Sequence, residues 1–544
     1  MGFREAASGW EGVRGGWEGM EFLGFREAAS GWGGVRGGWE GMELLGFREA
    51  ASGWGWGLAG GSSVGGTLWY GWAMAVIGLD LGTSGVKAVA VDAAGRVVGS
   101  ARAGVALRRE GMGTAEQDVE AIWAAACDVL RQAGGSGVEA VAISGAMHSL
   151  VPVDGDGRAL AGAMTWADRR AAATAWAGRI DADALYRRTG CPPGELYHPL
   201  RLRWWAGQGV RPARWASIKD VVVHRLTGRW AADLSVASAT GLVDIHRRGY
   251  DGEALKLAGI DATALPPLVE PTAVVGPVSG AASAATGLGA GLPVVAGASD
   301  GALANVGAAG PGGDDVVITV GTSAAVRRLV DRPRFDPQRR TWCYIATADR
   351  YVHGSAMNNA GLAVSHAAGG DGSIGAALRG AAAVAPGCGG VTVLPFVTGE
   401  RGLIWPPHVA WAVEPSDRAS ADAAVMMRAT LEGVCCGVAE LWDAVTAEGR
   451  TGEARLSGGI VGSPLWSQML ADMLGVRLRP IEAADASALG AAKLGGQAIG
   501  RATGPPAGEG PGVLEPNRER SAAYEQVRRR FRTACERRGW MRNG

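Results

Sequence analysis

Cysteine, charge imbalance and long hydrophobic runs are what this chain of 544 residues lacks. Its seven cysteines form no CxxC pair and no Cys/His cluster with metal-ligand spacing, which indicates a reducing, cytoplasmic compartment and no zinc site. Cys435 and Cys436 lie in a helical hydrophobic pattern and are interpreted as core thiols. No uninterrupted hydrophobic run reaches the length of a membrane span. Basic and acidic residues both number 53, so the zero net charge predicts no attraction to nucleic acid or to a membrane.

Residues 1–73 differ in composition from the rest of the chain. A segment starting at Gly2 recurs at Gly24 and begins again at Gly46, a period of 22 residues. These repeats have no hydrophobic face sufficient for a core and no signal-peptide pattern. We expect them to be low-complexity, disordered sequence or to lie upstream of a true start at Met74. A Trp-rich interaction segment is the alternative.

A strand–turn–strand pattern follows directly after Met74. Two short hydrophobic runs flank an acid, Asp80, and a turn of small residues, Gly82, Thr83 and Ser84. Backbone amides and hydroxyls in such a turn can surround a phosphate, because glycine lets the backbone approach closely. Asp80 at the strand end is suited to hold a hydrated Mg²⁺. An ordinary hairpin is the competing interpretation.

The same pattern occurs a second time in the chain. Residues 316–326 form a hydrophobic strand, a turn of Gly321, Thr322 and Ser323, and another hydrophobic run. Two such turns facing each other would hold a nucleotide triphosphate from both sides. The repeat therefore predicts two similar domains that share one site in a cleft.

Three further stretches carry polar side chains at the ends of expected strands. A strand over 138–143 leads to Met147 and His148, at the sheet edge where ligands bind in α/β folds. In the stretch Trp166 to Arg170, Trp166 offers a hydrophobic face to a carbon chain and Asp168 can accept hydrogen bonds from hydroxyls. Arg169 or Arg170 can bind a carboxylate through two hydrogen bonds, although solvated charges at a helix start would look the same.

Asp300 follows the strand 292–296 and is our candidate for the group that accepts a hydroxyl proton. A carboxylate can orient a hydroxyl and then take its proton, and small neighbours such as Gly301 leave room for a substrate. The alternative is that Asp300 only caps a helix starting at Ala302. Further along, Gly458 and Gly459 precede a helix from Pro464, a loop on which an adenosine can lie flat.

These motifs together resemble the FGGY carbohydrate kinases, and among them the gluconate kinases, over residues 74–501. The motifs that carry the resemblance are Asp80 to Ser84, the second Gly-Thr-Ser turn, Met147-His148, Trp166 to Asp168, Gly297 to Gly301, and Gly458-Gly459 with Gln468. The resemblance implies an α/β, two-domain, actin-like ATPase and sugar kinase (ribonuclease H-like) fold with a central cleft. The expected parts are 1–73 (repeats), 74–309 (sugar-binding), 310–505 (nucleotide-binding) and 506–544 (a linker and basic helix).

The resemblance also implies roles for single residues. Asp300 is the expected catalytic base, and Asp80 and Asp300 are the expected Mg²⁺ ligands. The expected substrate-binding residues are Met147, His148, Trp166, Asp168, Arg169 and Gly301. ATP is expected to contact Gly82, Thr83, Ser84, Gly321, Thr322, Ser323, Gly458, Gly459 and Gln468.

The expected activity is ATP-dependent phosphorylation of a small sugar or sugar acid, with D-gluconate giving 6-phospho-D-gluconate as the first choice. Xylulokinase is the rival enzyme, and a non-catalytic ATP-binding switch is the rival of another class. The sequence does not distinguish a homodimer from a monomer.

Overall fold

The computed structural model describes residues 74–541, with gaps at 112, 136, 175–180, 310–314, 371–373, 401–403, 416–421, 450, 482–484, 502–503 and 505–511. All of the described residues belong to one compact unit. The expectations for residues 1–73 lie outside the described residues.

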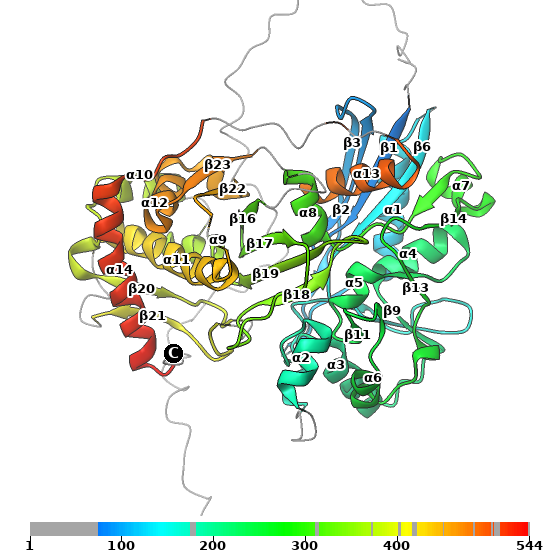
Figure 1. Ribbon diagram of the computed structural model, residues 1–544, viewed down its shortest axis with the longest axis horizontal. Helices are drawn as coiled ribbons and strands as arrows, with labels where there is room; N and C mark the ends of the chain where they lie inside the picture. The colour runs from blue at the N-terminus through cyan, green and yellow to red at the C-terminus, as the bar shows by residue number, and fades with distance from the viewer. Residues whose placement is uncertain are drawn as a thin grey trace, which may run out of the picture. The chain divides into compact units, whose positions relative to one another are not determined.

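The first half of the described chain is built on a six-stranded sheet with the strand order β14-β15-β6-β1-β2-β3 (Figure 1). β1 pairs antiparallel with β2, which pairs antiparallel with β3, whereas β1 pairs parallel with β6 and β6 with β15. The hairpin expected after Met74 is therefore confirmed. The strands are β1 Ala75–Leu81, β2 Gly85–Asp92, β3 Val97–Gly104, β6 Val138–Gly145, β14 Val274–Pro277 and β15 Pro293–Val295.

Helices cover both faces of this first sheet. Successive side chains of β1 point to opposite sides, and the hydrophobic ones on each side are buried beneath helices. Ala75, Ile77, Leu79 and Leu81 pack in one cluster with α1 and α4, while Val76 packs in another with α8 and α13. The helices on the first face are α1 Val119–Ala133, α4 Ile218–Thr227 and α7 Gly280–Thr286. The helices on the second face are α8 Asp300–Ala309 and α13 Ala486–Ala498.

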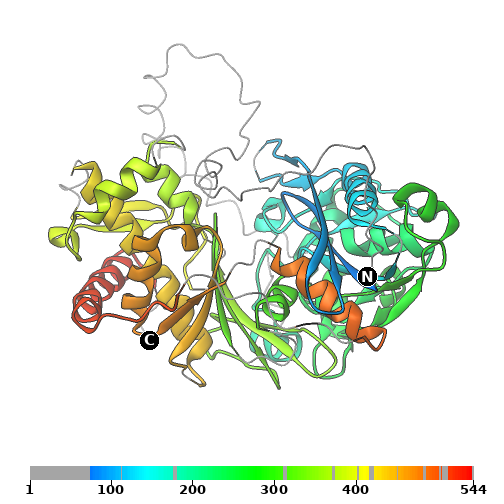
Figure 2. The same cartoon turned by 90° about the horizontal axis from the view of Figure 1, so that it is seen from above.

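Helix α13 comes late in the sequence yet lies against the first sheet (Figures 1 and 2). A Cβ at Gly78 of β1 would lie 1.8 Å from the Ala488 carbonyl oxygen, and one at Gly490 would lie 2.0 Å from the Leu303 carbonyl oxygen. Glycine at both positions is what allows this close packing. The segment expected as one nucleotide-binding domain, 310–505, thus contributes a helix to the core of the first half.

The second half repeats the arrangement of the five strands β15-β6-β1-β2-β3 of the first half, and its sixth strand lies at the opposite edge of the sheet. The order is β18-β19-β17-β16-β22-β23, with β16 antiparallel to β17 and parallel to β22. β16 thus takes the place of β1, and the predicted second hairpin and duplicated architecture are confirmed. The strands are β16 Val316–Val320, β17 Ala324–Val330, β18 Trp342–Ile345, β19 Tyr351–Met357, β22 Glu453–Ser457 and β23 Arg477–Pro480.

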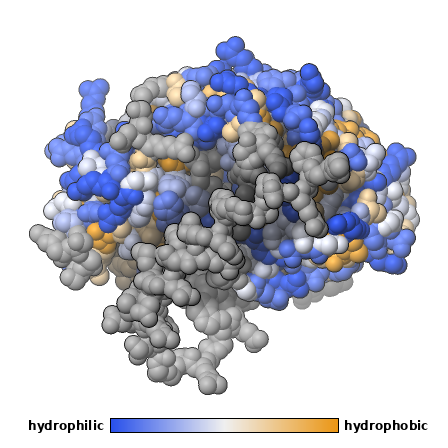
Figure 3. All heavy atoms as spheres, turned by 90° about the horizontal axis from the view of Figure 1, so that it is seen from below, coloured by the Kyte–Doolittle hydropathy of each residue, from blue (hydrophilic) through white to orange (hydrophobic). Residues whose placement is uncertain are grey.

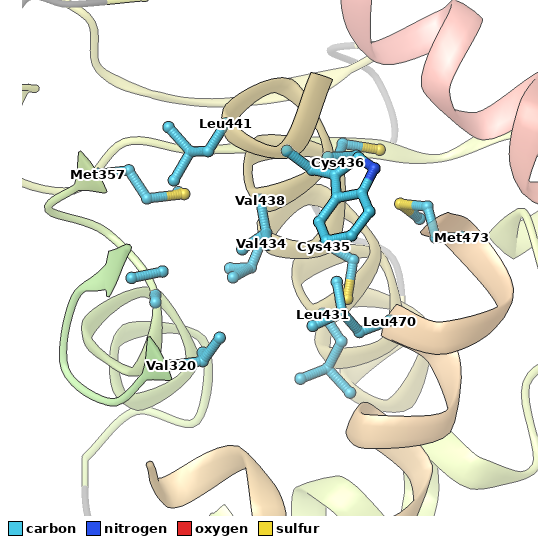
Figure 4. Packing of buried hydrophobic residues seen from close by; sticks show 14 of the residues in the cluster. Val320, Met357, Leu431, Val434, Cys435, Cys436, Val438, Leu441, Leu470 and Met473 are labelled. Carbon is cyan, nitrogen blue, oxygen red and sulfur yellow. The ribbon is translucent and has the colours of Figure 1, made fainter. Parts of the chain in front are cut away.

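The core of the second half surrounds α11, Ala423–Thr446, which is buried along most of its length. Leu431, Val434 and Val438 point toward the second sheet, and Cys435 lies near Leu470 of α12 (Figure 4). All seven cysteines are free and buried, so the interpretation of Cys435 and Cys436 as core thiols is confirmed. The remaining elements here are α9 Gly361–Ala367, α10 Ile374–Ala382, η4 Cys388–Gly390, β20 Thr392–Pro395, β21 Trp411–Glu414, η6 Gly459–Gly462 and α12 Pro464–Leu474.

The basic C-terminal helix α14, Arg518–Arg537, closes this core on one side (Figure 1). Its buried face includes Tyr524 and Phe531, which belong to the same cluster as α11. On another face, Arg532 pairs with Glu440 at 2.7 Å and with Asp443 at 2.9 Å. The basic residues of α14 therefore help to fasten it to α11.

The segment between β6 and β14 of the first half forms a smaller group of short elements. They are β7 Val151–Val153, β8 Ala163–Met164, η1 Arg170–Ala173, α2 Ala182–Thr189, α3 His198–Gly207, β9 Arg214–Ala216, β10 Ala232–Asp233, α5 Leu234–Ser238, β11 Val243–Asp244, β12 Gly249–Tyr250, α6 Gly252–Ala258, η2 Ala262–Ala264 and β13 Leu268–Val269, with β4 Leu107–Arg108 and β5 Glu116–Gln117 before them. Tyr197 from this group and Tyr344 of β18 share a buried cluster and a hydroxyl hydrogen bond of 3.0 Å. The two halves are thus joined by a common core.

Among the described residues, no helix is both long enough and apolar enough to cross a membrane. The face drawn in Figure 3 is largely hydrophilic, with hydrophobic residues in small separate groups.

Candidate active site

A cavity of about 900 Å³ lies where residues of both sheets meet. Five of the residues expected to act on substrates line it: Asp80, Asp300, Gly301, Gly458 and Gly459. The cavity is also lined by residues that were not expected, among them Lys87, Thr319, Arg327, Ser457, Asp485 and Ser487.

Asp80 lies near the end of β1, in register with Lys87 of β2 and Ser144 of β6. Burial raises the pKa of Asp80 to about 6, the Ser144 hydroxyl lowers it by donating a hydrogen bond of 2.6 Å, and the charge of Asp300 raises it. The two carboxylates therefore repel each other across the cavity. A cation between them would relieve this repulsion.

Asp300 is the first residue of α8, so the helix begins two residues earlier than expected. Ser299 occupies the position before it, and its hydroxyl accepts from the Ala302 amide at 3.4 Å. The Asp300 carboxylate accepts from the adjacent Gly301 amide, at 2.7 Å. Ser299 rather than Asp300 thus fills the place of the cap.

The loop before Asp300 is held by buried groups that sequence reasoning did not single out for this role. Lys219 of α4 is 1% exposed, and its ammonium group donates to Asp233 at 2.7 Å and to the Ala298 carbonyl at 3.1 Å. The Ser235 hydroxyl accepts from the Ser299 amide at 3.1 Å. The backbone that presents Asp300 is therefore fixed from two sides.

The first Gly-Thr-Ser turn is tied to the substrate-side loops. Gln117 donates to the Thr83 carbonyl at 2.9 Å and to the Gly82 carbonyl at 3.1 Å, while the Trp166 indole donates to the Thr83 hydroxyl at 3.0 Å. These bonds occupy oxygen atoms of the turn. Neither the Thr83 amide nor the Ser84 amide donates a backbone hydrogen bond to another described residue, so both donors can face a phosphate.

The second turn is packed against the start of α9. The Gly361 amide donates to the Gly321 carbonyl at 2.8 Å and the Leu362 amide to the Thr322 carbonyl at 3.2 Å. Ser323 ends the turn, and its carbonyl accepts from the Gly321 amide at 2.9 Å. Neither Gly-Thr-Ser turn itself is among the residues that line the cavity.

His148 lies in a strained part of the substrate-side loop, with a positive φ of 67°. Its ring meets Tyr197 and Tyr344 edge-on, with centroids 5.6 Å and 6.2 Å away. Arg201 is fully buried beneath it and donates to the His148 carbonyl at 2.7 Å and to the Asp168 carbonyl at 3.2 Å. Burial lowers the pKa of Arg201 to about 10. Sequence reasoning missed Arg201, whose position inside a helix gave no signal.

The sequence left open whether Arg169 or Arg170 could bind a carboxylate, and the two side chains differ in their surroundings. Arg170 donates to Asp168 at 3.0 Å, pairs with Glu116, and lies over the Trp204 ring at 4.7 Å, so its charge is already matched twice. Arg169 pairs only with Glu195 among the described residues, at 3.2 Å, and its side chain is 44% exposed. Of the two arginines, Arg169 is therefore the more exposed and has the fewer ion-pair partners.

Other expected residues take structural positions. Asp168 is 3% exposed and accepts from the Ala115 amide and Arg170, so its carboxylate organises the loop. Gln468 donates to Asp472 at 2.9 Å and to the Glu515 carbonyl at 2.8 Å, and it does not line the cavity. Met147 approaches the cavity at Gly301, where a Cβ would lie 3.1 Å from the Met147 methyl carbon.

The donor set of the cavity fits Mg²⁺ better than a softer metal. Asp80 and Asp300 offer carboxylate oxygens, which Mg²⁺ prefers, and it is held in proteins by one or two carboxylates together with substrate phosphates. No group of three or more histidine, cysteine, aspartate or glutamate side chains suited to a metal occurs in the described part of the chain. A site of only two carboxylates is consistent with a metal that arrives with a nucleotide.

Two halves of the same topology around one acid-lined cavity define the two-domain sugar kinase fold. The N-terminal domain of the FGGY family of carbohydrate kinases matches residues 75–307, and the C-terminal domain of that family matches residues 316–499. The chain belongs to the FGGY family of carbohydrate kinases, and it is an ATP-dependent sugar kinase.

The proteins to which this chain is similar include more than one kind of sugar kinase. Gluconokinase of Bacillus subtilis (strain 168) is 30% identical over 453 residues, which are 78% of this chain and 88% of that protein. Xylulose kinase of Streptomyces rubiginosus is 31% identical over 452 residues, 79% of this chain and 88% of that protein. The crystal structure of gluconate kinase from Lactobacillus acidophilus matches with a TM-score of 0.79 and 26% identity, covering 86% of this chain and 98% of that chain.

Proposed function

We propose that this kinase transfers the γ-phosphoryl group of Mg-ATP to the terminal hydroxyl of D-gluconate and yields 6-phospho-D-gluconate. The observation that carries the choice of a sugar acid is the accessible guanidinium of Arg169, next to the loop of Trp166 and Asp168. A carboxylate substrate needs such a cation, whereas an uncharged sugar does not. The similarity to gluconokinase and gluconate kinase supports the same choice.

The residues around the cavity would divide the chemistry among them. Asp300 orients the acceptor hydroxyl and takes its proton as the bond to phosphorus forms. Asp80 and Asp300 would hold Mg²⁺, which supplies positive charge against the phosphates when it is bound. The amides of the Gly82-Thr83-Ser84 turn and its counterpart at Gly321-Thr322-Ser323 would receive phosphate oxygens, and Gly458-Gly459 would support the adenosine.

On the substrate side, Trp166 would face the carbon chain, and Met147 and His148 would wall the hydroxyl groups. Asp168 acts through its neighbours, because its carboxylate already holds Arg170 and the Ala115 amide. Gln468 has two partners within the chain, so its contact with ATP requires a change of rotamer.

Xylulose phosphorylation is the competing function. The xylulose kinase of Streptomyces rubiginosus is as similar in sequence as the gluconokinase, at 31% against 30% identity. Both reactions would use the same base and the same nucleotide site, so the two proposals differ only in the acceptor.

An ATP-consumption assay with gluconate, xylulose, glycerol or no acceptor tests the proposal. We expect the highest kcat/KM with gluconate and little ATP consumption without an acceptor. A higher kcat/KM with xylulose would overturn the choice of gluconate. Turnover that no acceptor changes would instead favour an ATP-driven conformational switch.

Arg169→Ala and Arg170→Ala form a matched pair for the carboxylate contact. Loss of a charged hydrogen bond costs about 1.5–3 kcal/mol, and exposure of Arg169 reduces this. We expect Arg169→Ala to raise KM for gluconate on the order of tenfold and to leave KM for xylulose nearly unchanged. Arg170→Ala is expected to affect both acceptors alike, through lost stability of the loop. Equal effects of Arg169→Ala on both acceptors would contradict the contact.

A further inference from the structure

A second arginine, Arg327, lies at the point where the two halves meet. It belongs to β17, the strand that follows the second Gly-Thr-Ser turn, and it lines the same cavity as Asp300 and Gly301. A Cβ at Gly301 would lie 3.3 Å from the Nε atom of Arg327. A cation from the second half therefore reaches the residue next to the candidate base of the first half.

In the part of the chain that the structure describes, Arg327 lies in the field of Asp300 but has no direct ion-pair partner. Among the described residues, its Nε atom is buried without a hydrogen-bond partner. Burial lowers the pKa of Arg327, and the charge of Asp300 raises it. By contrast, the next residue, Arg328, donates to the Gly449 carbonyl at 2.9 Å.

A partly buried cation without an ion-pair partner is less costly when an anion completes the site. Two anions enter a sugar acid kinase: the phosphates of the nucleotide and the carboxylate of the acceptor. Arg327 lies beside Asp300, where the hydroxyl that receives the phosphoryl group must sit. The carboxylate is at the other end of the six-carbon chain, so the anion closest to Arg327 is the phosphoryl group in transfer.

We propose that Arg327 is a catalytic residue that donates hydrogen bonds to the non-bridging oxygens of the transferring phosphoryl group. The bond between the γ-phosphorus and the oxygen of the departing nucleoside diphosphate breaks, the bond to the acceptor oxygen forms, and the acceptor proton passes to Asp300. The guanidinium balances the negative charge on the three equatorial oxygens during this step. This inference rests on the role proposed above for Asp300, but not on which acceptor is used.

Arg327→Met and Arg327→Lys test the proposal, with Arg328→Met as the matched control on the same strand. Steady-state kinetics are measured with gluconate and with xylulose, and ATP binding by calorimetry. Removal of one donor to a developing charge lowers kcat by about 10²–10³-fold. We expect Arg327→Met to lose this much on every acceptor that the wild-type protein uses, with ATP affinity retained. Arg327→Lys should recover part of kcat, and Arg328→Met should keep it.

A second measurement does not depend on turnover. Aluminium fluoride with ADP mimics the transferring group, and the wild-type protein with its acceptor should trap ADP in a slowly dissociating complex. Arg327→Met should lose this trapping while its melting temperature stays close to that of Arg328→Met. Loss confined to KM for gluconate would make Arg327 a carboxylate contact and overturn the proposal, as would unchanged trapping. If the wild-type protein used only xylulose, the gluconate proposal would fail while the Arg327 test would run on xylulose.

Discussion

Replacement of Asp300 by asparagine separates catalysis from helix capping. The amide keeps an oxygen that can accept from the Gly301 amide, as the carboxylate does at 2.7 Å, but it cannot take a proton. Loss of a general base lowers the rate by roughly 10²-fold or more, which corresponds to about 2.7 kcal/mol of transition-state stabilisation. Because Ser299 fills the cap position, we expect the free energy of unfolding to change by less than about 0.5 kcal/mol.

The assay pairs single-turnover phosphoryl transfer with thermal unfolding, and Ser299→Ala is its matched control. The Ser299 hydroxyl accepts from the Ala302 amide and from Ser235, so its loss should cost about 1–2 kcal/mol of stability. Asp300→Asn should therefore be slow and stable, and Ser299→Ala less stable but active. An Asp300→Asn protein with near-normal kcat and reduced stability would refute the assignment of the base.

Three other variants test the framework around the site. Gly78→Ala would bring a Cβ to 1.8 Å from a carbonyl oxygen of α13 and should destabilise by about 1–3 kcal/mol in urea unfolding, whereas Gly104→Ala, with open space around it, should not. Burial raises the pKa of Asp220 from 3.8 to about 7. The contribution of its protonated carboxyl group to the free energy of unfolding is therefore present below pH 3.8 and is lost as pH rises through 7. Asp220→Asn should remove about 3 kcal/mol of the pH dependence of the free energy of unfolding between pH 5 and pH 8. Lys219→Met leaves the Asp233 carboxylate buried and unpaired and should cost about 3–5 kcal/mol, part of which Lys219→Met with Asp233→Asn should restore.

Local sequence pattern was sufficient for the elements around the first turn. Helix α1 begins at Val119 directly after its N-cap Asp118, whose side chain accepts from the Glu120 and Ala121 amides, so a short local pattern sets its start. The start of α8 was misjudged by two residues, because the glycine-rich approach hid Ser299 as the cap. The position of α13 could not be predicted, since its contacts with β1 and α8 join segments far apart in sequence. In the sequence, that contact is reflected in isolated glycines such as Gly78, Gly307 and Gly490. An isolated glycine is equally compatible with a turn or a bulge.

Residues of the candidate site could be predicted where an acidic residue lies between a hydrophobic run and a loop of small residues. Asp80 and Asp300 were found because each follows a hydrophobic run and lies at a small-residue loop, and both line the cavity. Lys87 and Arg327 were missed because each stands inside a strand, where a basic residue looks like a solvent-facing side chain. Their signal was positional: Lys87 follows the first turn by three residues and Arg327 follows the second by four.

The duplicated fold places different side chains at equivalent positions of its two halves. Asp80 of β1 is in register with Ser144 of β6 and accepts its hydroxyl hydrogen bond at 2.6 Å. At the equivalent place in the second half, Thr319 of β16 is in register with Ser457 of β22, and their hydroxyls lie 3.0 Å apart. The duplication kept the hydrogen bond but not the carboxylate. Asp80 and Asp300 of the cavity thus both come from the first half, so the metal and the hydroxyl acceptor proposed above would lie on that side. The second half contributes Arg327 to the same cavity, and the proposed transfer would place the phosphoryl group between this cation and the two carboxylates.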